Sequence, residues 1–141
     1  MSDRTRWQRQ NNPVIAEFRG NGGRVGGRYT GRPILLLTTT GAKSGLPRIT
    51  PLNYSTDGDR FVVIASKGGS PTHPDWYHNL AANPEVTIEV GTETFRARAT
   101  TAEEPERSRL YAQQAAQMPF FATYQQKATR QIPVVVFERL G

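Results

Sequence analysis

The sequence predicts a mainly β domain of the α+β class, namely a six-stranded antiparallel barrel with helices on its outside. The length of 141 residues suits one domain with one core. Six short segments are apolar or alternate between apolar and polar residues, and several follow one another too closely for a crossover helix. The strand–helix–strand rhythm of a doubly wound parallel sheet is missing.

The chain divides into a basic N-terminal arm, residues 1–32, and a barrel domain, residues 33–141. In the arm, Asn11 or Asn12 can cap a short helix that has Pro13 in its first turn and stops at Gly20. Five glycines then make residues 21–31 unsuited to regular structure. The arm holds seven arginines against two acidic residues, so most of the chain's net charge of +6 lies there.

Three strands are predicted before a central helix, and a fourth strand is predicted after it. The apolar run 34–37 continues through three threonines to residue 40 and ends at a glycine. Further strands are predicted at 48–55 and 61–66, with Asp57-Gly58 as the hairpin signal between them. The helix that follows is capped by Thr72, has Pro74 in its first turn, and ends before a fourth strand at 86–90.

The last third of the chain contributes two more strands and the remaining helices. Residues 95–99 alternate as the hairpin partner of 86–90. Thr101 is expected to cap a helix that Pro119 breaks, and residues 120–127 form a shorter aromatic helix or loop. The valine-rich run 133–137 is the sixth strand.

Several kinds of chemistry are excluded by composition and spacing. The chain has no cysteine, which removes disulfides, thiol nucleophiles and zinc–thiolate sites. His73 and His78 have no third ligand at metal-binding spacing, and neither belongs to a GxSxG-type hydrolase pattern, so we expect no metal. No apolar run approaches the ~20 residues of a membrane span, and no signal peptide is evident, so a cytoplasmic protein is expected.

Two glycine-containing turns could carry a ligand. The turn TTTGAKSGLPR, residues 38–48, offers backbone N–H groups, a hydroxyl and two cations to a phosphate or carboxylate, although its spacing is not that of a P-loop. The segment SKGG, residues 66–69, would let a planar ligand approach the backbone. From these residues alone, an ordinary basic hairpin turn and an ordinary glycine turn before a helix stay open as alternatives.

Three motifs together give a more specific indication. LLLTTTGAKSGLPRITPL, VIASKGGSPTHPDWYHNLAANP and IPVVVFER resemble the deazaflavin (F420)-dependent nitroreductase family of actinobacteria, also described as F420H2-dependent quinone reductases. The resemblance spans roughly residues 33–140. It implies a split β-barrel like that of FMN-binding proteins, and reduced coenzyme F420 as a hydride donor.

The resemblance also implies which residues bind the cofactor. Lys43, Ser44 and Arg48 would hold its phosphate or oligoglutamate tail, while Pro51, Leu52, Ser66 and Trp76 would pack or hydrogen-bond around the deazaflavin. The full set of implied cofactor contacts is Ala42, Lys43, Ser44, Arg48, Ile49, Thr50, Pro51, Leu52, Asn53, Ile64, Ala65, Ser66, Lys67, Asp75, Trp76, Tyr77, His78 and Asn79.

The implied reaction is hydride transfer to an electron-poor small molecule, with Ser66 and Tyr124 as the catalytic hydroxyls. The nitroreductase branch lines its substrate pocket with several tyrosines, whereas the matching positions here are Asn53, Met118, Phe121 and Tyr124. This departure weakens the case for nitroaromatic prodrugs and favours conjugated enones, lactones such as coumarin derivatives, and quinones as acceptors.

Two other readings of the same barrel stay open at this point. One is an oxidoreductase that binds FMN or FAD, and the other is a non-enzymatic barrel that carries a cofactor or binds nucleic acid through the basic arm. With F420 as the cofactor, no nucleic-acid partner is expected. The arm is then available for peripheral contact with an anionic membrane surface.

Overall fold

The computed structural model describes residues 3–140, with side chains from residue 8 onward. Its helices are α1 (Asp3–Gly20), α2 (Asp75–Ala82), α3 (Glu106–Gln117) and α4 (Phe120–Lys127), with short 3-10 turns η1 (Gly27–Tyr29) and η2 (Lys67–Gly69). Its strands are β1 (Ile34–Thr40), β2 (Pro47–Asn53), β3 (Ser55–Asp57), β4 (Arg60–Ile64), β5 (Glu85–Val90), β6 (Glu93–Thr101) and β7 (Val134–Arg139).

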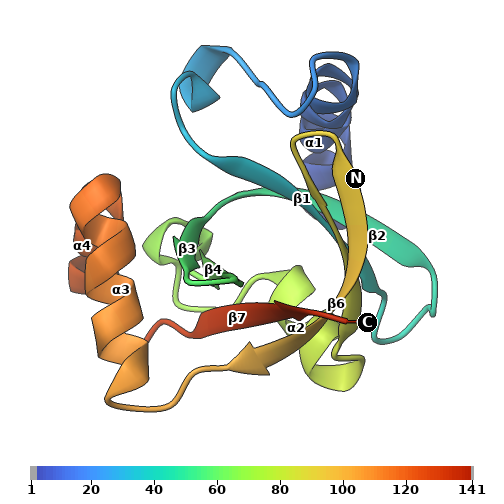
Figure 1. Cartoon of the computed structure of the whole chain (residues 1–141). Helices are drawn as coiled ribbons and strands as arrows, with labels where there is room; N and C mark the ends of the chain where they lie inside the picture. Colours follow the sequence, from blue (N-terminus) through green and yellow to red (C-terminus); the bar gives the residue numbers. More distant parts are fainter. Residues whose placement is uncertain (1–2, 141) are drawn as a thin grey trace.

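The strands form one antiparallel sheet in the order β2-β1-β5-β6-β7-β4-β3, and Figure 1 shows that this sheet is curled. Its two outermost strands, β2 and β3, are neighbours in the chain and are separated only by Tyr54. The Tyr54 N–H donates to the Pro33 carbonyl at 3.2 Å, which fixes this corner. The curled sheet therefore has its two edge strands joined through Tyr54 without pairing between them, and the mainly β, antiparallel prediction is confirmed.

The strand count was predicted as six, and the described residues form seven. The difference lies at Tyr54, where the predicted strand 48–55 turns a corner and changes its partner from β1 to β4. Period-2 alternation continues through such a corner, so it does not mark the break.

Three apolar clusters stabilise the sheet. The inner cluster contains buried residues of several strands and of α2, among them Leu35, Ile88, Phe137 and Trp76. A second cluster packs α3 and α4 on the sheet through residues such as Leu110 and Phe121. The third is made by α1 against β1 and is described next.

The N-terminal helix is longer than predicted. It begins at Asp3, ends at Gly20 as expected, and contains Pro13 in its interior rather than in its first turn. The carbonyl that Pro13 leaves without an amide partner belongs to Arg9, which is exposed, so water can satisfy it. Ile15 and Phe18 are buried against β1, and this packing stabilises the helix.

Two predicted caps were also wrong. The cap position of α2 is Pro74, two residues after Thr72, and that of α3 is Pro105. Thr101 is instead the last residue of β6, where it pairs with Val135 of β7. Thr101 is thus paired within the sheet, although threonine is also a favoured residue for a helix cap. Among the described residues, no helix combines the length and the apolar character that crossing a bilayer requires.

Candidate functional site

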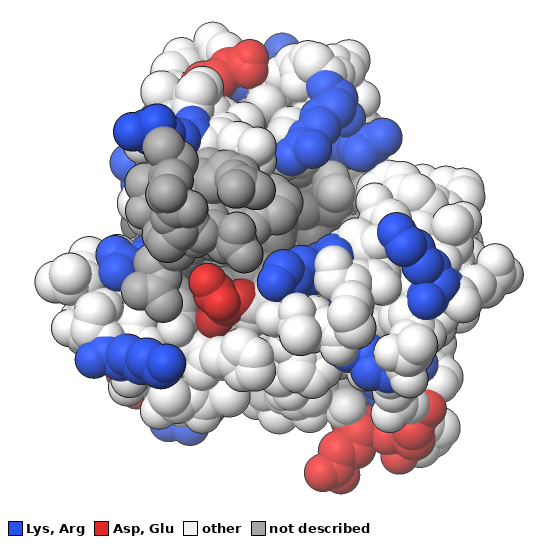
Figure 2. All heavy atoms as spheres, turned by 180° about the vertical axis from the view of Figure 1, so that it is seen from behind, with Lys and Arg blue, Asp and Glu red and all other residues white. Residues whose placement is uncertain are grey.

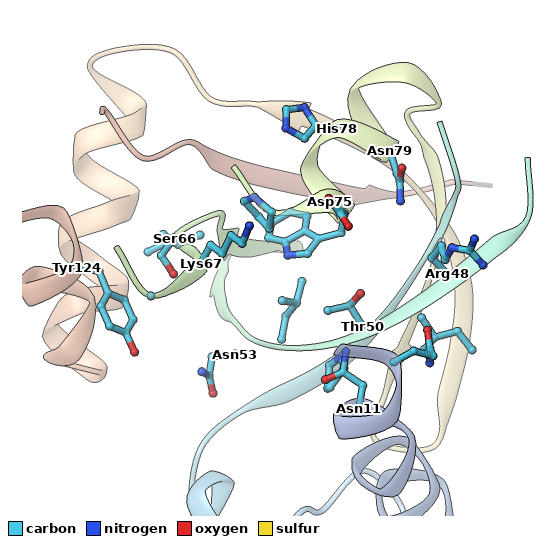
Figure 3. A pocket seen from close by; sticks show the side chains of 18 of the residues that line it. Asn11, Arg48, Thr50, Asn53, Ser66, Lys67, Asp75, His78, Asn79 and Tyr124 are labelled. Atoms are coloured by element: carbon cyan, nitrogen blue, oxygen red, sulfur yellow. The ribbon is translucent and has the colours of Figure 1, made fainter. Parts of the chain in front are cut away.

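A cavity of about 770 Å³ lies between α2, β2, α4, the loop after β4 and the N-terminal arm. This volume is in the range of sites for small molecules and cofactors. Figure 3 shows Asn79 and Asp75 on α2 on one side of it, Arg48 and Thr50 on β2 on another, and Tyr124 of α4 opposite them. Asn11 of α1 also reaches its rim.

The turn between β1 and β2 presents two backbone donors to this cavity. Its ends are closed by the Gly41 N–H on the Leu46 carbonyl at 2.8 Å and by the Gly45 N–H on the Gly41 carbonyl at 2.9 Å. The N–H groups of Lys43 and Ser44 between these ends have no acceptor among the described residues, and both residues line the cavity. The turn therefore has the donors that an anion requires.

A buried amide on α2 holds the same turn. Asn79 Oδ1 accepts the Ala42 N–H at 2.9 Å, and Asn79 Nδ2 donates to Thr39 Oγ1 at 3.3 Å. Only 9% of Asn79 is exposed, so both ends of its side chain are used within the protein. Asn79 lines the cavity, but its geometry is that of a support for the turn.

The loop after β4 contributes Ser66, Lys67 and Gly68 to the opposite wall. Ser66 is buried, and its hydroxyl makes no hydrogen bond with another described residue. Lys67 has φ of +47°, and it is the only described non-glycine residue in the left-handed region. The side chain of Lys67 donates to Thr72 Oγ1 at 3.3 Å.

The cavity has a strongly positive lining. Five basic side chains and one acidic one, Asp75, border it. None of the five takes part in an ion pair within the described part of the chain; they are Arg28, Arg32, Lys43, Arg48 and Lys67. On the face that Figure 2 shows, the visible Lys and Arg side chains lie in separate groups. The positive lining of the cavity suits a small anionic ligand. Separate basic groups suit a long nucleic-acid backbone less well.

An aromatic wall closes the cavity at α4. Phe120, Phe121 and Tyr124 stack edge to face or tilted, with ring centroids 4.6 to 5.7 Å apart. The Arg32 guanidinium lies over the Phe120 ring at 4.6 Å from its centroid. The arm thus contacts the part of the cavity that lies beside Tyr124.

One polar atom at the cavity lacks a partner. Asn53 Oδ1, at the end of β2, is buried and accepts no hydrogen bond from a described residue. A buried acceptor without a donor is costly unless a ligand or water supplies one. Asn53 is therefore suited to receive a donor group of a bound molecule.

Most of the predicted site residues lie together around this cavity. Those that line it are Ala42, Lys43, Ser44, Arg48, Ile49, Thr50, Pro51, Leu52, Asn53, Ile64, Ser66, Lys67, Asp75, Trp76, His78, Asn79, Phe121 and Tyr124.

Three predicted site residues do not line the cavity. Ala65 is fully buried among core residues, and Tyr77 packs on the same inner cluster with its hydroxyl 3.3 Å from Thr101 Oγ1. Met118, predicted as a substrate-pocket residue, is buried beneath α3 and α4. The chain neighbours of Ala65 and Tyr77 line the cavity, whereas those of Met118 do not.

The arm supplies the residues that sequence reasoning missed. Gln8, Asn11, Arg28, Tyr29 and Arg32 all line the cavity. Their only sequence signal is the density of arginines before residue 33, which does not tell a docked arm from a solvated one. The side chains of Arg4 and Arg6 lie outside the described residues. Phe120, Gly41, Gly68 and Pro74 complete the lining.

Comparisons with known proteins agree with one another. Residues 7–139 match the family model described as F420H(2)-dependent quinone reductase. An F420H(2)-dependent quinone reductase of Mycobacterium tuberculosis H37Rv is 45% identical over 128 residues, which cover 88% of this chain and 86% of that protein.

Two solved structures are similar to this chain. A structure described as an F420-H2 dependent reductase, FDR-A, is 42% identical with a TM-score of 0.70 and covers 76% of this chain and 95% of that one. A protein described as a domain-swapped dimer is 38% identical with a TM-score of 0.72, over 95% of this chain and 98% of that one.

Proposed function

This chain belongs to the F420H(2)-dependent quinone reductase family, and on that premise we propose that it is an oxidoreductase which uses reduced coenzyme F420 to reduce a small electron-poor acceptor. The single observation that carries the proposal beyond the family is the basic cavity, which gathers the residues that the three motifs supply. The cofactor performs the redox step, so the lack of an acid–base dyad among the described residues is consistent with it.

The donor set of the cavity fits this cofactor, a deazaflavin with a phosphate and an oligoglutamate tail. Anionic groups require N–H donors and cations, which Lys43, Ser44 and Arg48 provide at one end. A planar ring requires apolar faces and a few polar partners, which Trp76, Pro51 and Leu52 with the unpartnered Asn53 Oδ1 provide. Coenzyme F420, when bound and reduced, supplies a hydride from C5 of its deazaflavin ring.

The chain's own contribution is to bind, orient and shield. Lys43 and Arg48 neutralise the anionic tail, and the support of the turn by Asn79 fixes where that tail enters. Trp76 is 7% exposed and forms a rigid wall of the cavity. These residues would orient a bound cofactor with one ring face toward the acceptor and would partly exclude water from the site.

The acceptor is expected at the α4 side, where Asn53, Phe121 and Tyr124 border the cavity together with Phe120. Stacked aromatic rings favour planar conjugated acceptors. We propose quinones and conjugated enones or lactones, including coumarin derivatives, ahead of nitroaromatic compounds, because Tyr124 is the one tyrosine at the positions that match the nitroreductase pocket.

Ser66 and Tyr124 are proposed to hydrogen-bond the ring or the acceptor. Both side chains border the cavity, and the Ser66 hydroxyl makes no hydrogen bond with another described residue. If these hydroxyls position the acceptor or deliver the proton that follows hydride transfer, S66A and Y124F should reduce turnover by about 10- to 100-fold. Unchanged turnover in both variants would remove them from the mechanism.

The proposal is tested by anaerobic mixing of the protein with reduced F420 and a panel of quinones, enones and nitroaromatic compounds. Reoxidation of the cofactor should require the protein and an acceptor. Titration with oxidised F420 and with FMN in parallel separates the flavin alternative, since tight FMN binding without F420 binding would contradict the proposal. The likeness to FMN-binding split barrels and the contact of the arm with a membrane surface stay predictions.

A further inference from the structure

The loop after β4 contains one side-chain-bearing residue in a backbone conformation that such residues rarely adopt. Lys67 is in the left-handed region at φ +47°, followed by Gly68 and Gly69 at +65° and +82°. A side-chain-bearing residue keeps such a conformation only where its surroundings hold it. Ser66 and Lys67 of this loop border the cavity. A residue that fixes the loop therefore also fixes the positions of these two side chains at the site.

The guanidinium of Arg130 is the group that contacts this loop most extensively. Its Nη2 donates to the carbonyls of Ala65 at 3.1 Å and Ser66 at 3.0 Å. Its Nε donates to the Ser70 carbonyl at 3.0 Å. Arg130 therefore binds the loop on both sides of Lys67, and it forms no ion pair with any carboxylate of the described residues.

His73 is the fourth partner of Arg130. Arg130 Nη1 lies 2.8 Å from His73 Nδ1, and because a guanidinium has only donors, that nitrogen must be the acceptor of a neutral imidazole. Burial lowers the pKa of His73, and the charges of Arg130 and His78 lower it further. Protonation would turn the acceptor into a donor that faces the Arg130 cation.

The other titratable groups near this pair come from three elements. His78 and Tyr77 of α2 lie 5.8 and 4.9 Å from the His73 ring, measured between ring centroids. Tyr111 of α3 is near Arg130, and the Lys67 side chain bonds to Thr72 beside His73. None of these groups is acidic, so none of them stabilises the protonated form of His73.

We propose that Arg130, with neutral His73 as its partner, is a positioning residue that holds the 65–70 loop in the shape which presents Ser66 and Lys67 to the cofactor, so that acid weakens cofactor binding through His73. Neither residue lines the cavity, and both act through the loop. The identity of the ligand rests on the proposed function. The role of Arg130 in holding the loop does not depend on which ligand binds.

The first test compares R130K with R109K, a matched change at an arginine that pairs with Asp57 away from the cavity. A lysine ammonium lacks the planar fork that serves four acceptors at once. The Kd of oxidised F420 at pH 7.5 should rise about tenfold in R130K and stay at the wild-type value in R109K. An unchanged Kd in a folded R130K protein would overturn the proposal.

The second test isolates His73. In H73N the side-chain Oδ1 can replace Nδ1 as an acceptor, and the variant cannot titrate there. The ratio of the wild-type Kd to the H73N Kd is measured from pH 8 to pH 5, so that the pH effects common to both proteins, including ionisation of the ligand, cancel. The ratio should be near one above the ordinary histidine pKa of ~6.5 and should grow to about threefold or more at pH 5. A flat ratio contradicts the proposal.

The third test needs no cofactor. In the ligand-free protein, the amides of Gly69 and Ser70 are hydrogen-bonded to the carbonyls of Ser66 and Lys67 at 3.0 and 3.2 Å. Hydrogen exchange at these amides should be about tenfold faster in R130K than in R109K. Unchanged exchange overturns the proposal. If the wild type binds no F420, the proposed function fails, and exchange alone decides the claim about the loop.

Discussion

Asn79 on α2 accepts the backbone N–H of Ala42 through its side-chain oxygen, at 2.9 Å. This hydrogen bond joins a helix to the turn that offers Lys43 and Ser44 to the cavity. Asn79 was predicted as a direct cofactor contact. The structure shows its two polar ends bonded to Ala42 and Thr39, and Asn79 also lines the cavity, so its contact with the cofactor stays a prediction.

We therefore expect N79A to weaken the turn. The Ala42 N–H would lose its partner, and the Kd of oxidised F420 should rise about tenfold, as for the loss of one or two hydrogen bonds. Fluorescence quenching measures the Kd. N83A is the control, since Asn83 is an exposed residue one turn after Asn79, at the C-terminal cap of the same helix. Equal affinities for the two variants would show that the turn holds its shape without Asn79.

The basic end of the cavity is expected to recognise charge. The double variant K43A/R48A should bind F420 about 10- to 100-fold more weakly, and its Kd should depend less on salt than that of the wild type. A deazaflavin fragment without phosphate and glutamates should bind both proteins alike, and R98A on β6 should behave as the wild type. An equal loss of affinity for the fragment would place the two cations at the ring rather than at the tail.

Gly69 lies against α4 and has no room for a side chain. Its φ is +82°, and a Cβ there would be 3.0 Å from the Tyr124 carbonyl oxygen and 3.3 Å from Lys127 Cβ. G69A should cost ~2 kcal/mol or more of unfolding free energy and should reduce turnover by moving Tyr124. Urea denaturation measures the cost. G58A shares a positive φ of +62° without any such contact and should cost about 1 kcal/mol. Equal costs would mean that the contact with α4 is unimportant.

A buried polar pair joins β3 to α3. Ser55 Oγ donates to Gln114 Oε1 at 2.9 Å, while Gln114 Nε2 is buried with no acceptor among the described residues. S55A should lower the unfolding free energy by ~1–3 kcal/mol, because the amide oxygen loses its only donor. The double variant S55A/Q114M should recover most of this loss, since it removes the unpaired groups at nearly constant volume. Additive losses in the double variant would contradict this account.

Stability in acid should depend on Asp57. Hydrogen bonds from Arg109 and then from Arg60 hold the pKa of Asp57 below its ordinary value. The folded protein stabilises the ionised form of Asp57. The contribution of Asp57 to the unfolding free energy is therefore present above pH ~4 and is lost as the pH falls through the lowered pKa. D57N should lower the Tm at pH 7, and the two Tm curves should converge below pH ~4. D59N, at an exposed residue without an ion pair to a described partner, is the control. Parallel curves down to pH 2 would contradict the assignment.

The sequence predicted the strands and most of the cavity-lining residues, but it did not predict how the arm packs. The strand 34–40 and the end of α1 at Gly20 agree with the structure because alternation, threonines and glycine punctuation are local signals. The docking of Arg32 on Phe120 is not local, since it depends on how a glycine-rich segment returns to the barrel. The same holds for Arg130, whose four partners lie about sixty residues earlier in the chain.

The corner at Tyr54 has a consequence for how the protein behaves at high concentration. An exposed sheet edge is a template for strand addition by another molecule. Here one edge strand, β3, has three residues, and the other, β2, contains Pro47 and Pro51, which have no amide hydrogen to donate. Neither edge offers a long row of free donors. Few donors for amyloid-like strand addition are thus left on β3 and on β2, the edge strand that borders the cavity.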